Sequence, residues 1–453
     1  MAGMQYKHPG GAVKADLAEA FKGGSKLELW HGRWYSVAEA QAPVEARMNP
    51  SSRIRSLGSY PFARLDAEVT RLRDAGVDVV DFGVGDPSTP TPEIVREACK
   101  RGVDEHAAAG YPSYVGRADY LRAVADWTER RYGVSLDPKR EIAATIGSKE
   151  AVFHFPEAIL ELGEVVLVPN PGYPPYVTGT RFAEGEVCPY PLTAANDFLP
   201  DLAAIPQEDA ARARILWITA PHSPTGRQPS RADLARIVEW AAARDIIVAS
   251  DEAYSELWFR EPAPSVLEVA REGVIVFQSL SKRSCMTGYR VGWVAGDPRL
   301  VDLHKKLKTN IDSGVPNFIQ DAAIAALGDE VHVEETRAGY AHRKERLRAA
   351  FRACGLPDAD PDATIYLWQP VPKPFTDEEF SRLMLDPRLG LVVLPGSWMS
   401  ETVDGENPGR GYVRWALTPP EDQVEEAALR LEEHYSAVLA KALSKRADQK
   451  AAP

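Results

Sequence analysis

Short β-branched runs that alternate with helical segments constrain the fold of this chain more than any other feature. Segments with helical periodicity separate most of these runs, for example Ala151–Leu162 and Arg231–Ala243. Strands alternating with helices predict a mainly parallel sheet with helices on both faces, whose ligands bind at the carboxyl ends of the strands. The predicted strands are Ile142–Ile146, Val165–Val168, Ile215–Thr219, Ile246–Ala249, Val274–Phe277 and Val291–Ala295.

The pattern changes on either side of this region. An amphipathic helix (Pro61–Asp74) and a strand (Val77–Phe82) are expected before it. After Pro298, two long helical stretches, Gln320–Phe351 and Pro420–Leu443, are expected around three strand-like segments, and the tail from Ala440 is expected to fray. These segments are Thr364–Gln369, Leu391–Leu394 and Tyr412–Ala416.

We therefore expect an α/β fold with a large domain and a smaller α+β domain. We expect residues 1–55, which include the breaker cluster Asn49–Ser52, to form an N-terminal arm. The small domain is expected to comprise residues 56–80 and 316–453, and the large domain residues 81–315.

Composition and charge favour a soluble cytoplasmic enzyme. The 453 residues are 44% hydrophobic and 26% charged, and they contain neither an apolar run of membrane-spanning length nor a secretory signal pattern. The net charge of −12 is spread along the chain, so nucleic acid is a poor candidate partner. The four cysteines lack CxxC spacing, which argues against a zinc site and a disulfide framework.

Two segments after predicted strands carry residues suited to chemistry. Lys282 follows the Val274 strand among serines and arginines, where its amine can be partly desolvated and act as a nucleophile. A solvated basic loop would be the better interpretation if Lys282 stood alone. The turn Gly147–Lys149 opens a helix, and free backbone N–H groups at a helix N-terminus suit a phosphate, although Gly-Ser before a helix is also an ordinary cap.

The segment from Ser279 to Arg290, S-L-S-K-x-x-x-x-x-G-x-R, resembles the cofactor-lysine signature of class I/II aminotransferases, the fold-type I pyridoxal-phosphate enzymes. Asp251-Glu252-Ala253-Tyr254 is similar to the family's D-E-x-Y. The resemblance implies that Lys282 holds pyridoxal 5′-phosphate covalently, that Asp251 pairs with the protonated pyridine nitrogen, and that Tyr254 bonds the phenolic oxygen. A carboxylate in a low-dielectric site favours that protonated nitrogen. Alone, Asp251 could be a helix N-cap.

The same resemblance implies further site residues. The phosphate is expected on Gly147, Ser148, Lys149, Ser279, Ser281 and Arg290, and the cofactor ring is expected to stack on Tyr173. Arg414, in Tyr412–Leu417, is expected to make a two-pronged salt bridge to the substrate α-carboxylate, which the Gly85 amide would also face. Gly83 and Gly85 fit a dinucleotide fingerprint poorly, because no third glycine opens a helix.

Tyr111 matches the family's Y-x-x-x-x-G segment, whose tyrosine reaches the phosphate bound in the neighbouring subunit. This match implies a homodimer with shared active sites. Taken alone, a tyrosine beside glycine and proline is more often a packed loop residue.

One position departs from the family. An asparagine usually precedes Pro-Thr-Gly and bonds the phenolic oxygen, whereas this chain has Ser223 after His222. Three alternatives stay open: Ser223 donates the bond directly or through water, His222 takes over, or the imine pKa is higher than usual.

The resemblance implies transamination between an L-amino acid and a 2-oxo acid, with 2-oxoglutarate and glutamate as the expected pair. Lys282 would be both anchor and general acid/base. The run Ala363–Trp368 and the segments around Lys282 and Gly147 look most like N-succinyl-diaminopimelate or LL-diaminopimelate aminotransferases of lysine biosynthesis.

Several alternatives remain at this stage. Aspartate, alanine and aromatic aminotransferases share the scaffold, and the Ser223 departure leaves room for a β-lyase or an oxidase. A ligand-binding domain of a transcription regulator would need a DNA-binding module, and the residues before Tyr60 show no helix-turn-helix pattern.

Overall fold

The computed structural model describes residues 27–30, 33–36, 49–57, 63–108 and 110–451, which divide between two compact units, 1–59 and 60–453. In the first unit, β1 (Leu27–Trp30) pairs antiparallel with β2 (Arg33–Ser36). The expected breaker cluster instead starts a short helix, α4 (Ser52–Ser56), because the Ser51 hydroxyl caps it by accepting from the Ile54 amide. Most of the predicted arm lies outside the described residues.

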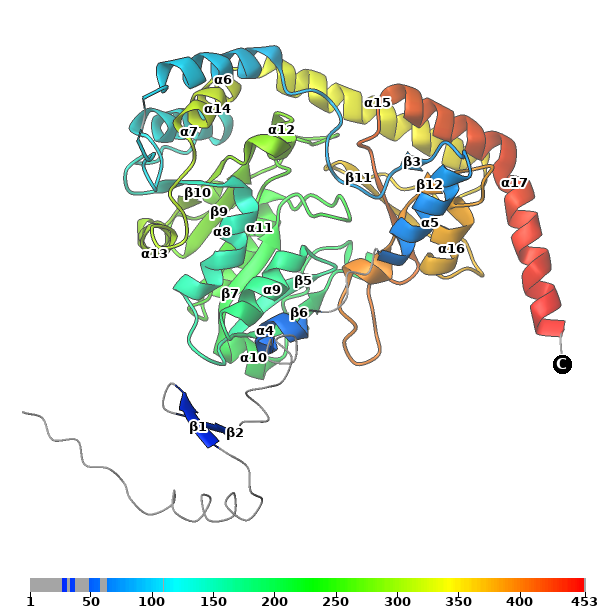
Figure 1. Cartoon of the computed structure of the whole chain (residues 1–453), viewed down its shortest axis with the longest axis horizontal. Coiled ribbons are helices and arrows are strands. Elements are labelled where there is room, and N and C mark those ends of the chain that lie inside the picture. The colour runs from blue at the N-terminus through cyan, green and yellow to red at the C-terminus, as the bar shows by residue number, and fades with distance from the viewer. Residues whose placement is uncertain (1–26, 31–32, 37–48, 58–62, 109, 452–453) are drawn as a thin grey trace, which may run out of the picture. The chain divides into compact units, whose positions relative to one another are not determined.

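A seven-stranded sheet forms the centre of the second unit (Figure 1), in the order β4-β10-β9-β8-β7-β5-β6. β10 (Gly292–Gly296) runs antiparallel to both of its neighbours, and the other pairs are parallel. The mainly parallel sheet is therefore confirmed. The remaining strands are β4 (Ile142–Thr145), β5 (Val165–Asn170), β6 (Glu186–Pro191), β7 (Ala213–Thr219), β8 (Ile247–Asp251) and β9 (Val274–Ser279).

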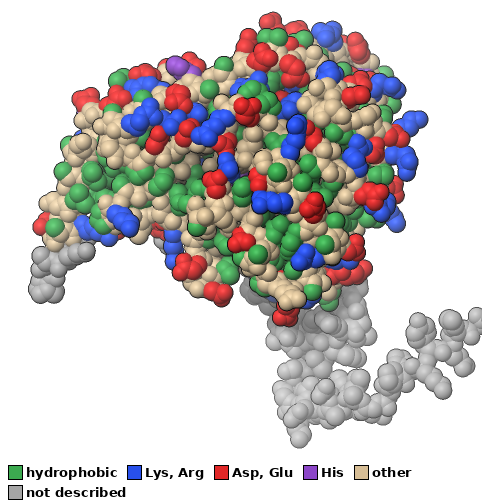
Figure 2. All heavy atoms as spheres, turned by 180° about the vertical axis from the view of Figure 1, so that it is seen from behind, with side chains coloured by type: hydrophobic (Ala, Val, Ile, Leu, Met, Phe, Trp, Pro, Cys, Tyr) green, Lys and Arg blue, Asp and Glu red, His purple; other side chains and the backbone are tan. Residues whose placement is uncertain are grey.

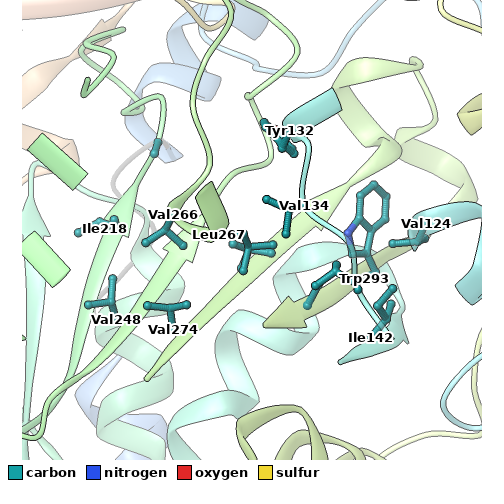
Figure 3. Packing of buried hydrophobic residues seen from close by; sticks show 14 of the residues in the cluster. Val124, Tyr132, Val134, Ile142, Ile218, Val248, Val266, Leu267, Val274 and Trp293 are labelled. Carbon is teal, nitrogen blue, oxygen red and sulfur yellow. The ribbon is translucent and has the colours of Figure 1, made fainter. Parts of the chain in front are cut away.

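Successive residues of these strands belong to two different buried clusters. Val165, Leu216 and Val274 pack on one face of the sheet, whereas Val166, Ile215 and Ile275 pack on the other. Figure 3 shows part of the first cluster, in which residues of several strands pack together. Both faces are apolar because both are covered by helices, which explains why these strands appear in the sequence as continuous apolar runs.

Different helices cover the two faces. The first face packs against α6 (Glu93–Glu105), α7 (Ala118–Tyr132), α11 (Arg231–Ala242) and α14 (Asn317–Leu327). The second packs against α8 (Gly147–His154), α9 (Pro174–Phe182) and α13 (Pro298–Lys308). The chain also forms α10 (Gln207–Arg212) and α12 (Leu280–Arg283).

A further buried cluster organises the C-terminal part. It joins a three-stranded sheet, in the order β11-β14-β13, to helices of the same region. The strands are β11 (Tyr366–Pro370), β13 (Leu394–Pro395) and β14 (Tyr412–Ala416), while β12 (Leu391–Val392) pairs parallel with β3 (Val80–Asp81). The helices are α15 (Val331–Ala353), α16 (Asp377–Met384) and α17 (Glu421–Ala451), while α5 (Ala63–Asp74) packs in a separate small cluster with Leu385, Val392 and Leu394.

Three expectations for secondary structure were wrong in detail, and one strand was missed. The expected helix Gln320–Phe351 is two helices, because Gly328–Glu330 separate α14 from α15. The strand Val77–Phe82 shrinks to β3, which pairs over only two residues, and β6 was not predicted. The tail does not fray at Ala440, because α17 continues to Ala451. The proposed domain boundaries stay predictions.

Charges of both signs are interspersed over the face shown in Figure 2. Many charged side chains of the described residues pair locally; for example, Arg346 binds both Glu425 and Glu432. In the part of the chain that the structure describes, no helix is long and apolar enough to cross a membrane.

Candidate active site

Three strands of the central sheet end next to residues that the sequence singled out. β4, β8 and β9 run in the same direction, because β10 is antiparallel to β4 and β9 while β8 is parallel to β9. Their carboxyl ends therefore lie along one edge of the sheet, where such sheets bind ligands. β4 leads into α8, β8 ends in Asp251, and β9 leads into the segment that carries Lys282.

The turn after β4 presents the N-terminus of α8. Gly147, its first residue, has φ +69°, and a Cβ at this position would collide with the guanidinium of Arg290. Arg290 is itself held over this turn, since it donates to the carbonyls of Thr287 (2.8 Å) and Ile146 (3.4 Å). Free helical N–H groups beside a guanidinium form a site suited to a phosphate.

Two serines lie between β9 and the lysine. The Ser279 hydroxyl accepts from the Ser281 amide at 3.1 Å and lies 2.8 Å from the Ser281 hydroxyl, so it caps α12. Both serines are buried. The cap fixes the direction in which Lys282 leaves the sheet.

Asp251 is buried at the end of β8. Its carboxylate accepts a 2.8 Å hydrogen bond from the Tyr176 hydroxyl and a 3.2 Å bond from the Ala253 amide. Burial raises the pKa of Asp251 to about 6, although these two bonds oppose the shift. Its donors are a hydroxyl and an amide rather than a cation, so the carboxylate is suited to a positively charged ligand atom.

Tyr176 positions this carboxylate. Its ring stacks on Trp217 with centroids 4.8 Å apart, and its hydroxyl also meets the Thr219 hydroxyl at 3.0 Å. No role was predicted for this tyrosine from the sequence. A tyrosine at helical spacing among apolar residues would have been the signal, but the same pattern also describes ordinary core residues.

Tyr173, the expected stacking residue, lies edge-on to Tyr176 with ring centroids 5.8 Å apart. Burial and the neighbouring Asp251 and Tyr366 raise the pKa of Tyr173, while Arg290 lowers it. These neighbours place Tyr173 between the Asp251 end and the Arg290 end of the site.

The side chain of His222 makes its contacts with neighbouring parts of the chain. Its Nδ1 lies 2.7 Å from the Thr225 hydroxyl and its Nε2 lies 3.1 Å from the Pro171 carbonyl oxygen. Burial lowers the pKa of His222 to about 4, so the ring is neutral near pH 7. Both ring nitrogens of His222 therefore already have partners within the chain.

Lys282 is partly buried, and its Nζ donates to the Gly85 carbonyl. Burial lowers the pKa of Lys282; the neighbouring Tyr366 and Asp86 oppose this shift, and Arg414 adds to it. The lysine side chain therefore contacts the turn after Phe82, although Gly85 and Lys282 are 197 positions apart in the sequence. A desolvated amine with a lowered pKa is a more effective nucleophile and base near neutral pH.

Arg414 lies on β14, in the C-terminal part of the chain, and is a neighbour of Lys282. Its Nη2 donates to the Gly83 carbonyl at 2.7 Å, and its guanidinium carbon lies 4.4 Å from the centroid of the Tyr366 ring. Its Nε is buried and has no hydrogen-bond partner among the described residues. A guanidinium that is held on one side and has a spare buried donor is suited to a carboxylate.

Tyr366 on β11 connects these groups, and no role was predicted for it. Its hydroxyl lies 3.1 Å from that of Tyr254, and a Cβ at Gly85 would collide with it. The pKa of Tyr254 is raised well above its usual value, mainly by burial and secondly by the neighbouring Tyr366. The segment Thr364–Gln369 was expected to be a strand, but nothing in its spacing indicated that Tyr366 faces the site.

Two of the expected cofactor residues have exposed side chains that are not gathered with Asp251, Lys282 and Arg414. Lys149 is exposed on the first turn of α8, and 85% of Tyr111 is exposed on the loop before α7. At this position, the backbone N–H group is therefore better placed to bind a phosphate than the Lys149 side chain is. Tyr111 is free to meet another molecule.

The site combines a phosphate-sized anion site at α8, a buried carboxylate at Asp251, a desolvated amine at Lys282 and a guanidinium with a spare donor at Arg414. These groups suit a phosphorylated heteroaromatic cation together with a carboxylate substrate.

The sequence matches the family aminotransferase class I and II over residues 77–431. It is 42% identical over 385 residues to the LL-diaminopimelate aminotransferase of Aquifex aeolicus, covering 84% of this chain and 98% of the relative. The corresponding enzyme of Desulforudis audaxviator is 43% identical, covering 84% of this chain and 96% of that enzyme.

Solved structures agree with this match. BacF of Bacillus subtilis superposes with a TM-score of 0.79 at 27% identity, covering 85% of this chain and 98% of that chain. A probable N-succinyldiaminopimelate aminotransferase from Thermus thermophilus superposes with a TM-score of 0.75 at 29% identity, covering 82% of this chain and 99% of the other.

Proposed function

The chain belongs to the class I and II aminotransferases, and from that premise we propose that it transfers the amino group of LL-diaminopimelate to 2-oxoglutarate in lysine biosynthesis. The observation that carries transamination is the partly buried Lys282 amine beside Arg414, whose Nε has no partner among the described residues. The choice of substrate rests on relatives of 42% and 43% identity, both named LL-diaminopimelate aminotransferase.

The family implies pyridoxal 5′-phosphate as the cofactor, and the described residues fit it. The N-terminus of α8 and Arg290 suit the phosphate, and the carboxylate of Asp251 suits a protonated ring nitrogen. When bound, the cofactor supplies an electron sink for the bond that breaks at the substrate Cα. The residues that would hold it are Gly147, Ser148, Lys149, Tyr173, Ser223, Asp251, Tyr254, Ser279, Ser281, Lys282 and Arg290, with Tyr111 of a second subunit.

The chain's own groups have separate tasks. Arg414 binds the substrate α-carboxylate and, with the amide of Gly85, orients the Cα–H bond towards Lys282. Lys282 Nζ removes that proton and later delivers it, so one amine is base and then acid. Its burial lowers the pKa of the amine and so favours the unprotonated form that acts as a base. Asp251 keeps a positive charge on the ring nitrogen, and Tyr254, oriented by Tyr366, donates to the phenolic oxygen.

Substrate choice is tested by supplying purified enzyme with 2-oxoglutarate and a panel of amino donors while glutamate is measured. We expect LL-diaminopimelate to give the highest kcat/KM, above N-succinyl-LL-diaminopimelate, aspartate, alanine and phenylalanine. A higher kcat/KM for any of those donors would overturn the substrate and leave transamination standing. Absence of glutamate with every donor would overturn transamination itself.

We also propose a homodimer in which Tyr111 binds the phosphate of the other subunit. The support is that Tyr111 is 85% exposed although the family pattern gives it a role at the phosphate. A hydroxyl bond to a phosphate contributes about 1 to 3 kcal/mol, so Tyr111→Phe should weaken cofactor binding by about tenfold or somewhat more.

Mixing tests the arrangement between subunits. Lys282→Ala and Tyr111→Ala chains, each of low activity, are allowed to exchange subunits, and one site of each heterodimer then has both side chains intact. Activity should rise on mixing. If mass spectrometry shows exchange but activity stays low, Tyr111 does not act across subunits.

A further inference from the structure

Lys308, at the end of α13, is a buried lysine that the proposed reaction does not use. Only 1% of it is exposed. Its Nζ binds Glu150 Oε1 at 2.7 Å and Asp312 Oδ2 at 2.6 Å. A buried ammonium is costly unless it is paired in this way, so the position calls for a positive charge.

Glu150 explains where that charge acts. It lies in the first turn of α8, and its Oε1 accepts a 3.2 Å hydrogen bond from the amide of Ile146, the residue that precedes the helix. A carboxylate here stabilises the helix N-terminus, but it also brings negative charge to the turn proposed to bind a phosphate. Without a counter-charge, Glu150 would repel that phosphate.

Lys308 is the cation that pairs with this carboxylate. His304, one turn earlier on α13, is buried, and burial lowers its pKa, so it is neutral near pH 7 and cannot replace the lysine charge. The second partner, Asp312, accepts from the Gly314 amide at 2.7 Å and thereby ties Lys308 to the segment after α13. The ammonium is therefore held in place from two sides.

We propose that Lys308 is a positioning residue of the cofactor site: it offsets the charge of Glu150 and holds that side chain on the Ile146 amide, so that the N-terminus of α8 accepts a phosphate. This inference rests on the proposed binding of pyridoxal 5′-phosphate at α8. It predicts an effect on the phosphate group rather than on the ring.

The test compares two probes, pyridoxal 5′-phosphate and pyridoxal, which differ only in the phosphate. Dissociation constants of both are measured for the apoenzyme by equilibrium dialysis. In Lys308→Met, binding of pyridoxal 5′-phosphate should weaken about tenfold while binding of pyridoxal changes little. Lys306→Met, at an exposed lysine of the same helix, is the matched control and should bind both probes as the wild type does.

Rescue separates charge from packing. Adding Glu150→Gln to Lys308→Met should restore most of the lost affinity, because the uncompensated carboxylate in the first turn of α8 is gone, although Asp312 still lacks its cation. An equal loss for both probes, or no recovery in the double variant, would overturn the proposal. So would a Lys308→Met variant that binds both probes like the wild type.

Glu150→Gln alone covers the case in which Lys308→Met does not fold. With Lys308 kept, this change removes one negative charge, so pyridoxal 5′-phosphate should bind about threefold more tightly and pyridoxal equally well. Weaker binding of the phosphorylated probe would overturn the proposal. A wild type that binds no pyridoxal 5′-phosphate would overturn the cofactor assignment as well, which distinguishes the two failures.

Discussion

The two halves of the candidate site are built differently. The cofactor half lies at the ends of buried strands, and its main groups already have partners within the chain: Asp251 with Tyr176, and Arg290 with the Thr287 and Ile146 carbonyls. The carboxylate half depends on Arg414, which binds the Gly83 carbonyl and keeps a buried Nε without a partner among the described residues.

The difference separates chemistry from recognition. Groups that are held by the protein itself keep their geometry before ligands arrive, as a reaction common to many substrates requires. The unpartnered Nε of Arg414 would gain its partner only on binding of the substrate carboxylate that we propose for it. Changes in the cofactor half should therefore lower kcat or cofactor binding, and changes in the carboxylate half should raise KM.

The largest effect is expected at Lys282, where the two halves meet. Lys282→Ala removes both the covalent anchor and the base, so activity should fall by about 10⁴-fold or more. Borohydride reduction followed by mass spectrometry should find no cofactor attached to the variant, whereas Lys306→Ala should be labelled like the wild type. Covalent labelling of the Lys282→Ala chain would contradict the assignment.

Arg414→Lys should produce the next largest effect, and chiefly in KM. Lysine keeps the charge but loses the planar fork and the stacking on Tyr366, so KM for the amino donor should rise by about a hundredfold with a smaller change in kcat. Arg410→Lys, at an exposed arginine close by, should leave both constants unchanged. A fall in kcat at constant KM would contradict the proposal that the carboxylate half acts in substrate binding and the cofactor half in the chemical step.

A smaller effect concerns the stability of the apoenzyme. Because the pKa of Asp251 is raised from 3.8 to about 6, its contribution to stability is fully present below pH 3.8 and is lost as pH rises through 6. Asp251→Asn should therefore raise the Tm of the apoenzyme at pH 8 by a few degrees and change it little at pH 4. Thermal denaturation at several pH values measures this.

Asp297 offers a control of opposite sign. Burial would raise its pKa, but hydrogen bonds from Arg299 and the Gly273 amide hold the pKa of Asp297 below its usual value. Its contribution is present above pH 3.8 and is lost as pH falls below that value. Asp297→Asn should thus lower Tm at pH 8. If both variants shifted Tm in the same direction at pH 8, the assignment for Asp251 would be wrong.

Much of the fold could be predicted because the sheet is covered on both faces. Strands buried on two sides need continuous apolar runs, which made six of the seven central strands visible in the sequence. β6 was missed because it is an edge strand whose six residues include two prolines and are only partly buried, so it forms no continuous apolar run. The break between α14 and α15 was missed because helical periodicity continues across a short interruption.

For the site, the sequence by itself determined which residue types stand at the strand ends: Asp251 after β8, the serine-lysine segment after β9 and the glycine turn after β4. Chain order brings these residues to one edge, since parallel strands end on the same side. Only the tertiary structure decided that Tyr176 meets Asp251, that Tyr366 lies against Gly85 and Arg414, and that Lys308 pairs with Glu150. Such contacts join segments up to 331 positions apart, as between Arg414 and Gly83, and no periodicity links residues so distant. They depend on how the C-terminal sheet and α13 pack against the strand ends, and packing of that kind is specified by the shape and charge of many side chains at once.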